Sequence, residues 1–193
     1  MATQKTLTDF KTALLGGGAR ANLFEVSMGN LPSSAGTLPD KFVMLCKAAN
    51  LPASNVGNID IPFRGRIFKV AGDRTFDTWQ ITVINDTDFA IRTIMENWMQ
   101  HIAQYKDASG VTNPQNYMAN ATVIQLNRNS STMGASSGAG VVNAKEYKFE
   151  DIFPTNISAI DLSFDSSDQI EEFTVEFQVN YWYPSGATGG KSN

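Results

Sequence analysis

One stretch constrains the fold more than any other part of the sequence: a strand pattern that runs directly into a helical one. From Phe76 onward apolar and polar residues alternate with the period of a half-buried β-strand. The apolar positions of this strand are Trp79, Ile81 and Val83. The spacing then changes to three and four residues, which predicts an α-helix over about 87–105. Val70–Asp86 is therefore interpreted as a turn, a strand and a helix cap.

The predicted helix is the only long one in the sequence, and it carries a single apolar stripe. The stripe consists of Ile91, Ile94, Met95, Trp98, Ile102 and Tyr105. Asn85, Asp86 or Thr87 is expected to cap the first turn, and Asp88 favours the positive end of the helix dipole. We expect the stripe to pack on a sheet that contains the Trp79 strand, with the other strands arranged around this unit.

The length of 193 residues and a hydrophobic content of 42% suffice for one domain with a core. We expect a polar N-terminal arm over 1–19, one domain over 20–183 and a flexible Gly/Ser tail over 184–193. The sequence shows neither a long apolar run nor the apolar core of a secretion signal, which predicts folding in a cytoplasm without a membrane segment. The single cysteine, Cys46, is expected to be a buried structural thiol.

Further strands are expected on both sides of the central unit. Their ranges are 20–28, Phe42–Ala48, about Ile59–Val70, Asn120–Arg128 and Lys145–Phe153, the last one stopped by Pro154. The connections are expected to be loops over 29–40 and 106–118. Residues 129–144 are poor in large side chains, so they are expected to form an exposed loop or to order only on a partner.

A basic stretch coincides with the third of these strands. Its cations are Arg64, Arg66, Lys69 and Arg74, and they alternate with aromatic and aliphatic residues. Such a stripe is typical either of nucleic-acid binding or of one solvated strand face. The net charge of -4 and the pI of about 4.9 disfavour a protein that grips phosphate backbones.

The C-terminal part predicts a hairpin. Ile160, Leu162 and Phe164 would share one face, Asp165–Asp168 would form the turn, and the return strand would start near Phe173. Its apolar face is expected to be buried, with Phe173 and Phe177 joining Trp79 and Trp98 as core anchors. The opposite face would be acidic and rich in amides. That face would contain Asp161, Ser163, Asp165, Glu172, Thr174, Glu176, Gln178 and Asn180.

The sequence contains few residues that suit catalysis. The one histidine, His101, lies within the predicted helix, where a structural role is favoured over a catalytic one. The acidic group around Asp165, Asp168, Glu171 and Glu172 suits a solvated turn better than a calcium loop. We therefore expect no enzyme, no metal and no cofactor. Segregated basic and acidic surfaces instead suit head-to-tail contact between identical copies.

Several stretches together resemble a known family. They are Asn22–Val26, Cys46–Ala53, Val70–Trp79, Val83–Asp86 and Phe153–Ile157 through Trp182. The chain resembles the tail tube proteins of contractile-tailed bacteriophages (myoviruses), a family related to the haemolysin-coregulated tube protein of type VI secretion. The resemblance implies a mainly β fold, an antiparallel β-sandwich or half-barrel with one flanking helix, that forms hexameric rings.

The resemblance also implies partners and surfaces. Rings would stack inside a contractile sheath in the virion tail, contact baseplate and tail-terminator proteins, and let genome DNA pass without sequence-specific binding. Lumen-facing residues would be Asp161, Ser163, Glu172, Thr174, Glu176 and Gln178. Arg64, Arg66, Lys69 and Arg74 would form an inter-subunit basic stripe. The alternatives are the tube of a phage-derived injection or secretion system carrying protein cargo, and a monomeric β-barrel that binds a small ligand.

Overall fold

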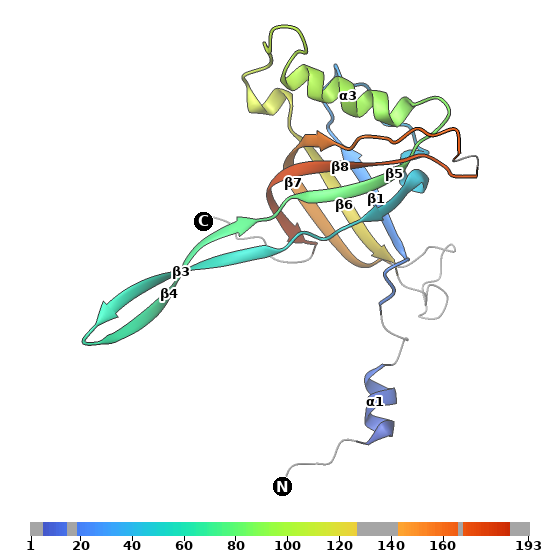
Figure 1. The fold of residues 1–193 in the computed structure, drawn as a ribbon. Coiled ribbons are helices and arrows are strands. Elements are labelled where there is room, and N and C mark those ends of the chain that lie inside the picture. Colours follow the sequence, from blue (N-terminus) through green and yellow to red (C-terminus); the bar gives the residue numbers. More distant parts are fainter. Residues whose placement is uncertain (1–5, 15–18, 127–142, 166–167, 186–193) are drawn as a thin grey trace.

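The computed structural model describes residues 6–14, 19–126, 143–165 and 168–185. Most strands belong to one antiparallel sheet of six strands in the order β1-β6-β7-β8-β5-β2. They are β1 (Phe24–Gly29), β2 (Cys46–Ala49), β5 (Trp79–Ile84), β6 (Ala119–Leu126), β7 (Asn143–Ile157) and β8 (Glu172–Pro184). The sheet curls until its edge strands β1 and β2 come into contact, and α3 (Ala90–Ile102) lies across one end (Figure 1). The predicted mainly β fold with one flanking helix is confirmed.

The central strand and helix form as their spacing predicts. Trp79, Ile81 and Val83 of β5 are buried, and so are Ile91, Met95 and Trp98 of α3. The Trp98 ring lies 5.9 Å from the ring of Phe177, which is the β8 partner of Trp79 in the sheet register. The helix therefore packs its stripe on the Trp79 sheet, as predicted. Tyr105 is the exception, because the helix ends before it and 72% of its surface is exposed.

The predicted side-chain cap of this helix is wrong. Phe89 occupies the cap position with a left-handed backbone (φ 51°), and no side chain caps the helix. Asp86 and Asp88 instead form ion pairs with Lys41, the latter at 3.2 Å. The hydrogen bond from Lys41 lowers the pKa of the Asp86 carboxyl. These two carboxylates thus connect the turn before α3 to the segment before β2, and they do not cap the helix.

The core is an aromatic stack inside the curled sheet. Trp79 stacks on Phe149 with ring centroids 4.8 Å apart and lies 5.3 Å from Phe177. Trp79, Trp98, Phe173 and Phe177 are each at most 1% exposed. Cys46 is also buried, as expected, and burial raises the pKa of its thiol to about 12.

Two strand predictions before β5 are only partly right, since β2 occupies the second half of the first predicted range. Phe42–Ala48 begins as one helical turn, α2 (Phe42–Leu45), because the apolar run suits either structure and the turn buries Phe42. The expected single strand over about Ile59–Val70, with its following turn, is a hairpin of β3 (Ser54–Phe63) and β4 (Arg66–Phe76). Arg64 and Gly65 connect them with positive φ angles of 44° and 81°. Two such residues form the tight turn that strand twist favours.

A C-terminal hairpin is present, but its first strand is β7 rather than the predicted strand that contains Ile160, Leu162 and Phe164. β7 continues through Pro154 to Ile157, with a register shift at Pro154 and Asn156 that tolerates the missing backbone N–H. β7 then pairs with β8. The predicted first strand belongs to the β7–β8 loop, described for residues 158–165 and 168–171, where 79% of Leu162 and all of Phe164 are exposed.

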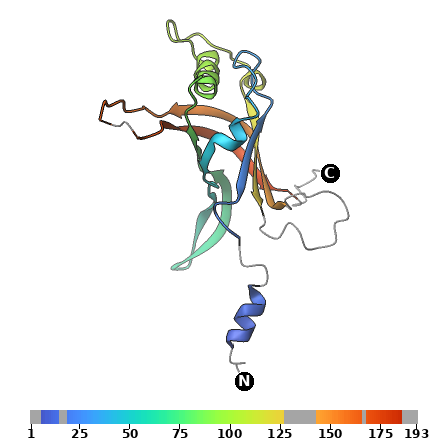
Figure 2. The same ribbon diagram turned by 90° about the vertical axis from the view of Figure 1, so that its right-hand side faces the viewer.

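The remaining predicted segments lie at the ends and in one connection. α1 (Leu7–Ala13) forms within the arm, has no buried residue and stands apart from the sheet (Figures 1 and 2). The 106–118 loop contains a short 3-10 helix, Pro114–Asn116. Most of the 129–144 segment and of the 184–193 tail lies outside the described residues. Among the helices that the structure describes, none is long and apolar enough to cross a membrane.

Candidate assembly surfaces

The β3–β4 hairpin projects from the body as an isolated two-stranded ribbon (Figures 1 and 2). Beyond its base, where Phe76 lies against Trp182, its large apolar side chains are between 39% and 66% exposed. They are Val56, Ile59, Ile61, Phe63, Ile67, Phe68 and Val70. A lone ribbon is marginally stable in water, and exposed apolar clusters of this kind mark interaction sites. The hairpin is therefore a candidate interaction surface.

The hairpin is basic, although its cations do not share one face. Four cations stand against the two carboxylates of Asp60 and Asp73. Arg66 and Lys69 are three positions apart on β4, so their side chains point to opposite faces of the ribbon. Lys69 lies 3.8 Å from Asp60, its cross-strand neighbour. The cations therefore do not form one solvated strand face, which was one of the two alternatives, and the hairpin carries positive charge on both faces.

A second surface is the polar face of β8 and β5. Glu172, Thr174, Glu176 and Gln178 alternate along β8 with the buried residues Phe173 to Val179, so they share the face opposite the core. Across the sheet, Thr82 and Thr174 hydroxyls lie 3.2 Å apart. Lys47 donates to Glu172 at 2.5 Å. The surface therefore combines one neutralised carboxylate with the carboxylate of Glu176.

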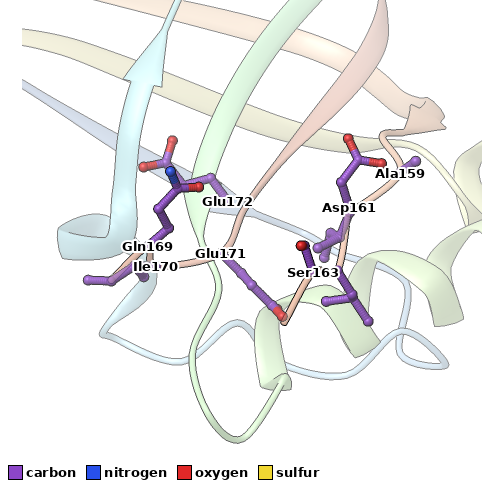
Figure 3. A pocket seen from close by; sticks show the side chains of 9 residues that line it. Ala159, Asp161, Ser163, Gln169, Ile170, Glu171 and Glu172 are labelled. Carbon is purple, nitrogen blue, oxygen red and sulfur yellow. The ribbon is translucent and has the colours of Figure 1, made fainter. Parts of the chain in front are cut away.

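A third surface is a pocket of about 300 Å³ between the two limbs of the β7–β8 loop (Figure 3). Asp161 and Ser163 lie on one limb, which places them off the β8 strand face where the predicted hairpin had put them. Gln169, Ile170 and Glu172 lie on the other limb. The pocket thus combines carboxylates with exposed apolar side chains.

Hydrogen bonds to the sheet and to the turn before α3 fix the roots of this loop. Ser158 exchanges two hydrogen bonds with Thr174: its N–H donates at 2.8 Å and its hydroxyl accepts at 2.9 Å. Glu171 accepts from the Asn85 side chain at 2.9 Å and from the Asn85 backbone N–H at 2.8 Å. The pocket walls are therefore held at both ends.

His101 lies in a polar setting on α3. It lines a shallow pocket of about 340 Å³ on α3 together with Ser34, Asn97, Gln100 and Gln104. In the part of the chain that the structure describes, no three His, Cys, Asp or Glu side chains are grouped to hold a metal ion. The surfaces that combine charge with exposed apolar area are therefore the candidate functional sites.

The structure thus combines a curled sheet, a helix across one end and two projecting segments of opposite charge. A family model described as "Phage tail tube protein" matches residues 19–185. The chain belongs to the phage tail tube protein family. Over 164 residues it is 33% identical to the tail tube protein gp19 of Enterobacteria phage T4, covering 85% of this chain and 90% of the relative. It is thus a tail tube protein of the myovirus type, as the resemblance implied.

Solved structures support the same fold. A chain of the anti-feeding prophage baseplate, described as 6-fold symmetrised, matches with a TM-score of 0.59 at 10% identity, covering 90% of this chain and 99% of that one. A chain of the sheath-tube complex of an extracellular contractile injection system matches with a TM-score of 0.55 at 13% identity, covering 94% and 98%. Identities this low support the architecture and nothing beyond it.

Proposed function

We propose that this chain is a non-catalytic subunit that forms hexameric rings, which stack inside a contractile sheath and enclose a channel for genome ejection. The observation that carries the proposal is the β3–β4 hairpin, whose apolar side chains are exposed and which projects from the sheet. A second copy is the partner that such a self-complementary chain supplies. The sheath-tube and 6-fold descriptions belong to the structural neighbours, and the proposal extends them to this chain.

The proposal includes the wider setting of the tube. Assembly takes place in the host bacterial cytoplasm, and the finished tube contacts sheath, baseplate and tail-terminator proteins. Residues 20–183 form the folded body, with 1–19 as an arm and 184–193 as a tail. Arg64, Arg66, Lys69 and Arg74 take part in subunit contacts, on both faces of the hairpin.

Concentration-dependent assembly tests this function. The purified full chain is expected to pass from small species to rings and tubes as its concentration rises, because stacking contacts form only between copies. Analytical ultracentrifugation with negative-stain electron microscopy at two concentrations measures this. A protein that remains monomeric at all concentrations would contradict the proposal and favour a monomeric barrel.

The polar face of β8 is proposed to line the channel through Glu172, Thr174, Glu176 and Gln178. A polar and acidic wall repels DNA phosphates, whereas a basic wall would bind each passing turn through counterion release. Because Glu172 is paired with Lys47, Glu176 is the carboxylate of this β8 face chosen for the charge test. Asp161 and Ser163, also expected in the lumen, lie on the loop at the end of this face.

Reversing this charge is expected to slow DNA passage without harming the fold. Glu176→Lys combined with Gln178→Lys changes two side chains that point away from the core, so tubes should still form. Infectivity should fall at least tenfold, and genome release should slow most at low salt. Glu176→Gln with Gln178→Asn serves as the matched neutral control. Unchanged infectivity of the lysine variant would show that this face does not line the channel.

A further inference from the structure

The hairpin and the β7–β8 loop lie at opposite ends of the same strand. β4 leads into the first residue of β5, Trp79. The last residue of β5, Ile84, pairs with Glu172, which ends the loop. Figure 1 shows the hairpin and the loop projecting in opposite directions from the sheet. A subunit with different elements at its two ends can contact the next copy head to tail, and such contacts stack openly where the rotation between copies does not close a ring.

The loop end presents acidic and apolar groups together. Asp161 contributes a carboxylate from one limb of the pocket, while Glu172 on the other limb is already paired with Lys47. Leu162 and Ile170 line the same pocket and are 79% and 73% exposed. Exposed aliphatic side chains beside carboxylates match a partner that is both apolar and cationic.

The hairpin tip has the complementary chemistry. Phe63 and Ile67 flank the turn and are 66% and 64% exposed, while Arg64 and Arg66 contribute two guanidinium groups. Among the described residues, the ion pair within the hairpin joins Lys69 to Asp60 and does not involve these arginines. Guanidinium groups pair with carboxylates through two parallel hydrogen bonds, which adds geometric specificity.

We propose that the pocket between the limbs of the β7–β8 loop is the socket for the hairpin tip of a second copy in the next ring. Arg64 and Arg66 approach the carboxylate of Asp161, and Phe63 and Ile67 pack against Leu162 and Ile170. The inference rests on the proposed tube and names the surface that receives the hairpin. Asp161 and Ser163 therefore serve ring stacking rather than the channel wall.

Charge reversal on each side of the contact tests the socket. Asp161→Arg, and separately Arg64→Asp with Arg66→Asp, change exposed side chains, so circular dichroism and thermal unfolding should match the wild type. Each variant is expected to form rings that fail to stack, with tube mass by sedimentation at least tenfold lower. Combining the three changes in one chain should restore much of the tube. Asp165→Arg, on the same loop but outside the pocket lining, is the matched control and should stack normally.

The outcomes distinguish a failure of the socket from a failure of the proposed tube function. Rings from each single-sided variant with tubes from the combined variant would establish the socket. Normal tubes from Asp161→Arg, or from the double arginine variant, would overturn the socket while leaving the tube function intact. Absence of rings and tubes from the wild-type chain would refute both.

Discussion

Replacing Trp98 with alanine is expected to lower the free energy of unfolding of the subunit by about 3 to 5 kcal/mol, the usual cost of removing a large buried aromatic side chain. The ring is fully buried where α3 meets the sheet, 5.9 Å from the Phe177 ring. Its indole N–H also donates to the Tyr117 carbonyl at 2.6 Å. The substitution therefore removes the main anchor of the helix together with its hydrogen bond. Urea denaturation below the assembly concentration measures the change.

Two comparisons make this prediction specific. Tyr105→Ala, just beyond the helix, should change the free energy of unfolding by less than about 0.5 kcal/mol, because that side chain is largely exposed. Trp98→Phe should cost more than Trp79→Phe, since only Trp98 donates a hydrogen bond through its indole within the described structure. A Trp98→Ala protein as stable as the wild type would contradict the central position of this residue.

The second large effect is expected on assembly rather than folding. Ile61 and Phe68 face each other across the hairpin and are 46% and 64% exposed. Changing both to serine removes apolar area that the proposed contact buries, about 2 to 4 kcal/mol per contact. The concentration needed for assembly should rise at least tenfold, since 1.4 kcal/mol corresponds to a factor of ten. Light scattering across a dilution series measures it.

A matched variant separates the hairpin from general surface apolarity. Met44 is 87% exposed on α2 of the body, so Met44→Ser should leave assembly unchanged. The Ile61→Ser, Phe68→Ser protein should keep the denaturation midpoint of the wild type, because the hairpin lies outside the aromatic core. Assembly at the wild-type concentration would contradict a role of these side chains in contacts between copies.

The central unit was predictable because its spacing and its burial agree. Around Trp79 the apolar residues alternate with the period of a strand, and around Trp98 they repeat with the period of a helix. The structure buries the apolar face of each element. The hairpin was missed because both of its faces are exposed, so its apolar residues follow no inside-outside alternation. The informative signal was the Arg64-Gly65 pair, a turn between two strand-length runs.

The candidate sites divide in the same way. The polar face of β8 follows from simple alternation, so the sequence predicted which side chains share it. The pocket could not be predicted in this way, because Ile160, Leu162 and Phe164 alternate like a strand and yet form a loop. β8 already pairs with β7 on one edge and β5 on the other, which leaves no edge for a third strand. Only the completed sheet reveals that these residues project at the end opposite the hairpin.

The most direct test of head-to-tail assembly is an electron cryomicroscopy reconstruction of tubes assembled from the purified full chain. The prediction is a hexameric ring in each layer, with the β3–β4 hairpin of one subunit extending into the β7–β8 pocket of a subunit in the next layer. A reconstruction in which the hairpin remains exposed to solvent, or contacts only subunits of its own ring, would contradict the account.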